Sequence, residues 1–92
     1  MNNGYTKDLV LQSLNTIIKD GLNQMGSQTF SNEMYMQWVY YSQKMLEVST
    51  RAYNPTILLN YLRVLSNISP TLDPKQKIGI CLEYLIGVLK II

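Results

Sequence analysis

Side chains that catalyse reactions or hold metal ions are scarce in this sequence. It contains no histidine, which removes histidine acid–base catalysis, Ser–His and Cys–His pairs and most transition-metal sites. The one cysteine, Cys81, lies among Ile80, Leu82 and Leu85. Apolar neighbours raise a thiol pKa and lower its reactivity. We therefore expect Cys81 to be a small buried hydrophobic residue and not a nucleophile.

The remaining polar residues do not form a recognisable catalytic pattern. The carboxylates are scattered; Asp8 and Asp20, for example, are most simply solvated charges on one helix. The glycine-containing stretches "NNG" and "QMGSQ" lack the spacing and the following lysine of a phosphate-binding loop. The sequence thus predicts a protein that is not an enzyme, with no catalytic residues, metal ligands or cofactor site.

Charge and cysteine usage bear on location and partners. The net charge is +2 and charged residues make up 15% of the chain, without a basic stripe. Nucleic-acid binding needs clustered Lys and Arg, so we do not expect it. The first ten residues show no signal-peptide pattern, and a single cysteine fits a reducing compartment. These features indicate a cytoplasmic protein.

The elements that position the remaining residues are all helical. Helical spacing of apolar residues and the breaks between them predict one domain, residues 1–92, containing helices at about 6–24, 32–53, 55–67 and 74–92. We expect an all-α fold, a compact bundle of four helices with antiparallel neighbours.

Capping residues mark the expected helix starts. Thr6, Ser31 and Asn54 can each cap a helix, and Pro55 suits a first helical position. The stretch "DPKQ", from Asp73 to Gln76, has the pattern of a capping box followed by a proline. The fourth helix should therefore start at a well-defined residue.

An aromatic-rich segment dominates the second expected helix. Its predicted inward stripe consists of Met34, Trp38, Tyr41, Met45, Val48 and Ala52. Because Tyr40 and Tyr41 point about 100° apart on a helix, we expect Tyr41 inside and Tyr40 partly exposed. The expected partner-binding surface here is Tyr40, Gln37, Lys44 and Arg51.

The closing segment, "KIGICLEYLIGVLKII", is apolar on nearly all sides. It is shorter than the roughly 20 apolar residues of a membrane span and carries Glu83 and Lys90, so we do not expect it to cross a membrane. One stripe, containing Ile78, Leu82, Leu85 and Leu89, should face the core. A second stripe should be available to another chain, and it consists of Ile80, Tyr84, Val88 and Ile91.

Three stretches carry a family resemblance: "LNTIIKDGLNQM", "MQWVYYSQKMLEVSTRAYNPTILLNYL" and "KIGICLEYLIGVLKII". With a first helix ending in Lys-Asp-Gly, Trp38 followed by Leu46, and a closing apolar helix with an inner glycine, they resemble a small helical accessory domain. Such domains occur beside effector domains in prokaryotic antiviral defence proteins. The resemblance implies a binding or oligomerising role without catalytic residues.

Two functions remain open on the sequence. The first is a non-enzymatic protein–protein interaction or oligomerisation module, expected to form a homodimer, acting as a small subunit or regulator linked to phage–host conflict. The alternative is an immunity-type or inhibitor protein that binds a toxin, a receptor or a host enzyme.

Overall fold

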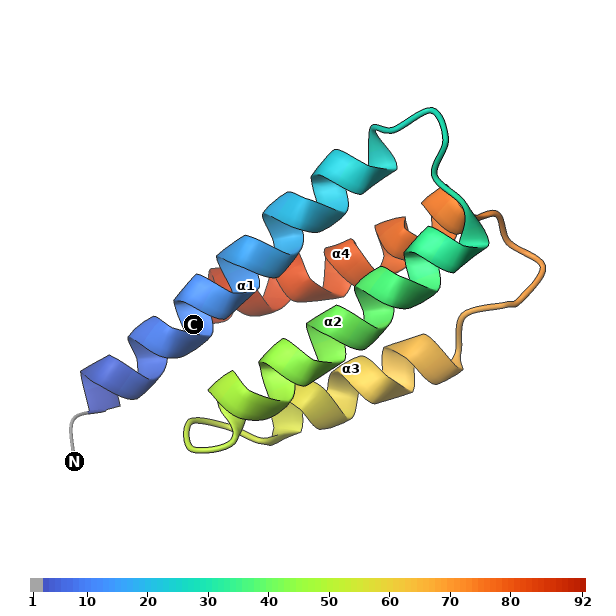
Figure 1. Cartoon of the computed structure of the whole chain (residues 1–92). Coiled ribbons are helices and arrows are strands. Elements are labelled where there is room, and N and C mark those ends of the chain that lie inside the picture. The colour runs from blue at the N-terminus through green and yellow to red at the C-terminus, as the bar shows by residue number, and fades with distance from the viewer. Residues whose placement is uncertain (1–2) are drawn as a thin grey trace.

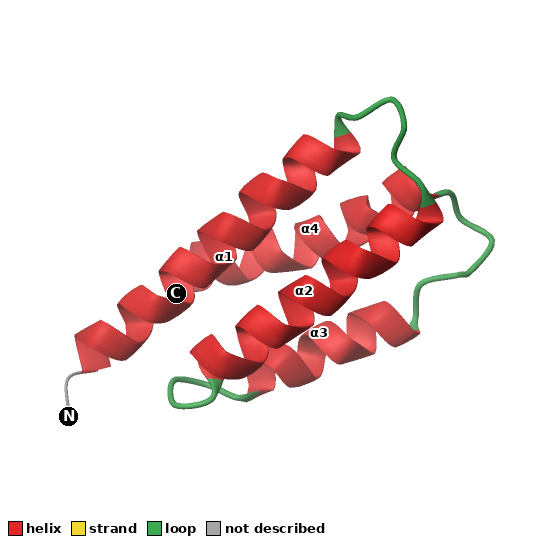
Figure 2. Cartoon of the chain, in the orientation of Figure 1, coloured by secondary structure: helices red, strands yellow, loops and turns green. Residues whose placement is uncertain are grey.

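The chain folds into four helices joined by short connections, which confirms the predicted all-α bundle (Figures 1 and 2). The structure is a computed structural model that describes the backbone of residues 3–92 and the side chains of residues 6–92. The helices are α1 (Asn3–Met25), α2 (Asn32–Thr50), α3 (Thr56–Ser66) and α4 (Pro74–Ile91). No strand occurs in this part of the chain.

Local capping explains where three of the helices begin. Ser31 Oγ accepts a hydrogen bond from the Met34 amide at the start of α2. At the start of α4, Asp73 and Gln76 form the predicted reciprocal capping box. Asn54 stands one residue before the N-cap of α3, yet its side chain still accepts a hydrogen bond from the Thr56 amide at 3.1 Å.

The ends of two helices differ from the prediction. Helix α1 begins at Asn3, so Thr6 lies inside the helix and is not its N-cap. Helix α2 ends at Thr50, whereas the sequence predicts that it continues to about Tyr53. The Thr50 carbonyl accepts from the amides of Tyr53 and Asn54, which closes a turn that leads directly into α3.

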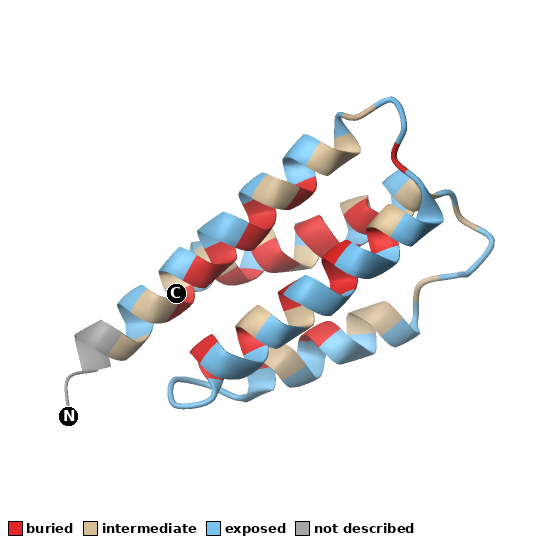
Figure 3. Cartoon of the chain, viewed as in Figure 1, coloured by how far each residue is buried: buried red, intermediate tan, exposed pale blue. Residues whose placement is uncertain are grey.

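The helices pack in the order α1, α2, α3, α4 around a core, with antiparallel neighbours (Figure 1). Helices α2 and α4 also touch across the bundle, whereas α1 and α3 do not meet within the described part of the chain. The shape is elongated, 44 × 23 × 20 Å. Buried residues face inward on every helix (Figure 3), and the largest fully buried side chains are Trp38, Tyr61, Leu14, Ile17, Leu46, Ile78 and Leu85.

Helix α2 is turned by roughly 100° from the predicted orientation, about one residue around the helix. Trp38 is the one member of the predicted stripe that is buried, at 1% exposure, while Val48 is 70% exposed. The true inward face is Tyr35, Trp38, Val39, Ser42, Leu46, Ser49 and Thr50. This face contains small hydroxyl residues, which a pattern of apolar spacing assigns to solvent.

Candidate functional site

Helix α4 presents one open sector to solvent. The helix contacts α1, α3 and α2, so most of its circumference is covered. Ile78, Leu82 and Leu85 face the core, as predicted, with 0%, 2% and 0% exposure. The open sector follows from the 3.6-residue period and runs along Ile80, Glu83, Gly87 and Ile91.

A groove of about 500 Å³ lies along this sector, on the α3 side. We call it the α3–α4 groove; its lining residues are Val64, Ile80, Glu83, Tyr84, Gly87, Val88 and Ile91. Ile91 is 84% exposed, the largest value among the exposed large hydrophobic residues. All four predicted interface residues of α4 line this groove, and Val64 of α3 is the wall that the sequence did not identify.

The four predicted residues are not equally available. Ile80 and Ile91 are exposed at the surface of the groove. Tyr84 is half-buried, because its hydroxyl donates to the Ile57 carbonyl at 2.8 Å and its ring stacks on Tyr61. Val88 is buried at 7% exposure, so the expectation that it is free for another chain is wrong. On the α4 helix, Val88 lies nearer to the core-facing stripe than Ile80 and Ile91 do.

The two glycines of α4 have different surroundings. A Cβ atom built on Gly79 would lie 4.0 Å from Met25 Sδ of α1, an ordinary van der Waals contact. A Cβ atom on Gly87 would have nothing within 4 Å. Gly87, in the penultimate turn of α4, is therefore a helical glycine that no contact within the bundle requires.

The second predicted surface lies on the outer face of α2, where Gln37, Tyr40, Lys44 and Arg51 are all exposed. Tyr40 is 64% exposed, as expected, and Lys44 Nζ lies 5.5 Å from the centre of its ring. Tyr41 is also exposed, at 40%, which corrects the prediction that it packs inside. The turn of α2 described above moves Tyr41 out of the core.

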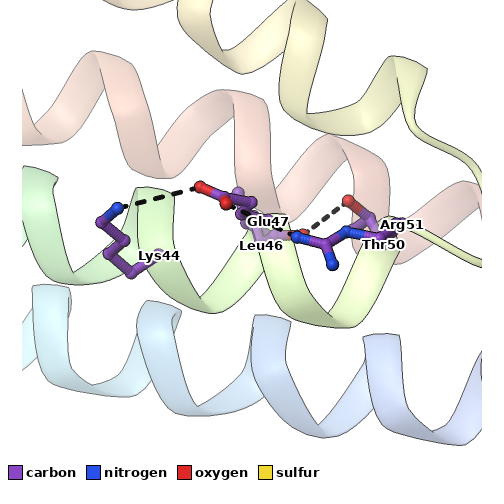
Figure 4. A network of polar contacts seen from close by, with 5 residues as sticks. All are labelled: Lys44, Leu46, Glu47, Thr50 and Arg51. Atoms are coloured by element: carbon purple, nitrogen blue, oxygen red, sulfur yellow. Dashed lines mark hydrogen bonds and ion pairs between the residues drawn. The ribbon is translucent and has the colours of Figure 1, made fainter.

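Ion pairs on this face hold the long side chains loosely. Glu47 lies 4.0 Å from Lys44 and 3.5 Å from Arg51 (Figure 4). Exposed pairs of this kind contribute about 0–1 kcal/mol, so the charges remain free to rearrange for a partner. Because α2 and α4 face each other across the bundle, this face and the α3–α4 groove point to opposite sides. The two predicted surfaces are therefore separate sites.

A groove between α1 and α2 was not predicted from the sequence. Tyr41, Met45 and Val48, predicted as core, instead line a groove of about 350 Å³ between α1 and α2. The rest of this α1–α2 groove is Leu9, Ser13, Lys44 and Ser49. Its sequence signal was visible as the apolar spacing of these α2 residues, but spacing does not distinguish a core stripe from an open one.

The chemistry of Cys81 agrees with its apolar sequence context. Cys81 has 0% exposure, and its Sγ lies 3.8 Å from the Tyr35 hydroxyl oxygen. Burial raises the pKa of the Cys81 thiol, so the thiol keeps its proton and is a poor nucleophile. Among the described residues, no three His, Cys, Asp or Glu side chains gather in a way that could hold a metal ion. Within residues 3–92, no helix has the length and hydropathy needed to cross a bilayer.

Comparison with protein-family models, curated proteins and solved structures gives no match for this chain. The resemblance to accessory domains of antiviral defence proteins stays a prediction.

Proposed function

We propose that this protein is a non-enzymatic interaction module that forms a homodimer through the α3–α4 groove. The observation that supports the proposal is the open space around Gly87. Gly87 stands in the penultimate turn of α4 with open space at its Cβ position, between the exposed side chains of Ile80 and Ile91.

The energetics of glycine support a close contact at this point. A glycine in a helix interior costs about 1 kcal/mol relative to alanine. At Gly21 the fold itself requires a glycine, since a Cβ atom there would collide with Leu82 and Trp38, whereas no contact requires a glycine at Gly87. A second chain that crosses α4 at Gly87 would require one, because the missing side chain lets two helix backbones approach.

A second copy is the simplest occupant of the groove. Homodimers with two-fold symmetry bring the same patch of both subunits together, and the patch must complement itself. The α3–α4 groove offers both a projecting apolar side chain, Ile91, and an apolar hollow beside Gly87. In a two-fold dimer the Ile91 side chain of each subunit would fill the hollow of the other.

The wider role follows the two predictions from the sequence. A dimer of this kind would act as a cytoplasmic subunit or regulator in phage–host conflict, and the single unpaired cysteine supports that location. The alternative is an immunity-type or inhibitor protein. The observation that favours it is the exposed α2 face around Tyr40, which a dimer through α4 would leave open to a toxin, a receptor or a host enzyme.

Sedimentation velocity over a range of protein concentrations tests the dimer. We expect the wild type to dimerise and Ile91→Glu or Ile80→Glu to be monomeric, because a charge in an apolar interface lacks a partner. Both side chains are exposed, so the variants should fold normally by circular dichroism. Tyr40→Glu, on the opposite side of the bundle, is the matched control and should dimerise like the wild type. A wild type that stays monomeric at every concentration contradicts the proposal.

Gly87→Ala separates the interface from general stability. Alanine should make the monomer more stable by about 1 kcal/mol and weaken the dimer at the same time. An alanine variant that dimerises as well as the wild type would show that α4 does not cross a second chain at Gly87.

A further inference from the structure

Two opposite charges flank Gly87 on the exposed sector of α4. Glu83 lies four residues before Gly87, Lys90 lies three residues after it, and both charged side chains are exposed. Because seven residues make nearly two full helical turns, Glu83 and Lys90 lie on one face of the helix. Among the described residues every ion pair is formed by Glu47, so neither charge of α4 has an ionic partner there.

Apolar surface continues from these charges toward α1. A groove of about 390 Å³ runs between the two helices, and we call it the α1–α4 groove. Its walls include Leu22 of α1, which is 47% exposed, and Ile86 of α4. Glu83 and Gly87 line both this groove and the α3–α4 groove. The two charges therefore lie in the middle of one surface that extends over both sides of α4.

The positions of the two charges favour one direction of pairing with a second copy. An antiparallel pair of α4 helices that crosses at Gly87 places Glu83 of each subunit opposite Lys90 of the other, because Gly87 lies next to the midpoint between them. A parallel pair places Glu83 opposite Glu83 and Lys90 opposite Lys90. Opposite charges attract and like charges repel, so the antiparallel direction is the favourable one.

Symmetry also determines which grooves meet. In an antiparallel two-fold pair, the side of α4 toward α3 meets the same side of the second α4, whereas in a parallel pair it meets the side toward α1. Ile91 is exposed and lines the α3–α4 groove. Only the antiparallel pair therefore brings Ile91 of one subunit to the α3–α4 groove of the other, as the proposed homodimer requires.

We infer that the two copies of α4 pair in the antiparallel direction about Gly87, with reciprocal ion pairs between Glu83 and Lys90. The interface then spans the α3–α4 groove and the α1–α4 groove, so it includes Leu22 of α1. This inference rests on the proposed homodimer and adds its direction, its register and the α1–α4 groove. Ion pairs at the edge of an interface contribute little affinity, so the main effect of these charges is to select the direction of pairing.

Sedimentation velocity of charge variants tests the direction. Glu83→Lys or Lys90→Glu gives the antiparallel dimer like charges at both contacts, so each variant should dimerise at least about 10-fold more weakly than the wild type. The double variant, Glu83→Lys with Lys90→Glu, restores both ion pairs with the signs exchanged and should dimerise like the wild type. A parallel dimer has like charges at both contacts already, so each single variant would dimerise like the wild type.

Glu47→Lys is the matched control, because it makes the same change of net charge on the outer face of α2 and should dimerise like the wild type. Circular dichroism checks that every variant folds. Leu22→Glu tests the α1–α4 groove and should weaken the dimer, because it places a charge in an apolar interface. A Leu22→Glu variant that dimerises like the wild type would remove the α1–α4 groove from the interface.

The outcomes separate this inference from the homodimer itself. A wild type that stays monomeric overturns both. If the wild type dimerises and Ile91→Glu is monomeric, but Glu83→Lys and Lys90→Glu dimerise like the wild type, the homodimer stands and the antiparallel direction is overturned. A double variant that dimerises as weakly as the single variants also overturns the reciprocal ion pairs.

Discussion

Tyrosine and tryptophan take the place of phenylalanine in this core because their polar atoms find partners. Trp38 Nε1 donates to the Ile17 carbonyl at 3.2 Å, and the Tyr61 hydroxyl shares a 2.7 Å hydrogen bond with Ser42 Oγ. Tyr84 bonds the Ile57 carbonyl. Each hydrogen bond joins two helices and fixes their relative position along the bundle. These contacts account for Trp38, Tyr61 and Tyr84 in the skewed aromatic composition, whereas Tyr40, Tyr41 and Tyr53 are exposed.

Ser49 has a buried hydroxyl group that makes no hydrogen bond, and the folded protein should become more stable when this group is removed. Ser49→Ala should raise the free energy of unfolding by about 1 kcal/mol, because a buried unsatisfied group carries a desolvation cost and alanine favours a helix. Urea unfolding measures the change in the free energy of unfolding. Ser42→Ala is the matched control, and it should lower stability by a similar amount, since Tyr61 loses its partner. A loss of stability in Ser49→Ala would show that its hydroxyl is already satisfied.

Alkaline pH should weaken the fold through the same buried groups. Burial raises the pKa of Tyr35, Tyr61 and Cys81 in the folded protein. In the unfolded chain these groups ionise near their ordinary values, about 8.5 for Cys and about 10 for Tyr. Between the unfolded and folded pKa values the folded state binds more protons, so stability falls as pH rises.

We therefore expect the free energy of unfolding to be fully retained near pH 7, to fall above about pH 8.5 and to fall more steeply above about pH 10. Urea unfolding across this range measures it. Cys81→Ser removes the first part of the decline and keeps the second. Constant stability up to about pH 10.5 would contradict the expectation.

At the scale of the helix, capping determines where a helix begins, and packing determines which of its faces is buried. The Asp73–Gln76 box and the Ser31 cap were predictable because capping involves residues three apart in the chain. The orientation of α2 was not predictable, because its buried face contains hydroxyl side chains, which apolar spacing assigns to solvent. Thr50 bonds a carbonyl of its own helix, and Ser42 bonds both the Val39 carbonyl and the hydroxyl of Tyr61 in α3.

Gly21 marks a close contact of α1 with side chains of α2 and α4. A Cβ atom there would lie 2.8 Å from Leu82 Cδ2 and 2.9 Å from Trp38 Cζ2, so α4 or the indole must shift. Overpacking of this kind costs about 1–3 kcal/mol and exceeds the helix-propensity gain of about 1 kcal/mol. Gly21→Ala should therefore lower the free energy of unfolding by about 1 kcal/mol, as measured by thermal or urea unfolding.

The matched control is Gly79→Ala. Its new methyl group would meet only Met25 Sδ at 4.0 Å, so we expect a gain of about 0.5–1 kcal/mol from helix propensity. Equal effects of the two substitutions would show that the crossing at Gly21 is looser than the structure has it.

Across the whole molecule, the diagonal arrangement of α2 and α4 separates the exposed surfaces. The outer face of α2 and the outer sector of α4 point away from each other, so one can be covered while the other stays open. A dimer through α4 would therefore not block the Tyr40 face or the α1–α2 groove.

Thermal stability should depend on protein concentration if the dimer forms. Dimerisation stabilises the folded state by mass action, and each kcal/mol raises the Tm of a domain of this size by roughly 4–8 °C. Scanning calorimetry of the wild type should show a Tm that rises with concentration. The Tm of Ile91→Glu should not change with concentration. A constant Tm for the wild type would argue against self-association.

The sequence by itself determined the helix count, the breaks between helices, the caps at Ser31 and Asp73, the buried face of α4 and the exposure of Tyr40. These depend on the 3.6-residue period and on contacts within a few residues. Only the tertiary structure decided that Tyr41 and Val48 face solvent, that Val88 is covered, and that Gly21 is packed tightly while Gly87 is open. Whether a side chain such as Tyr41, Val48 or Val88 is covered depends on helices far away in the chain, and local spacing carries no record of them.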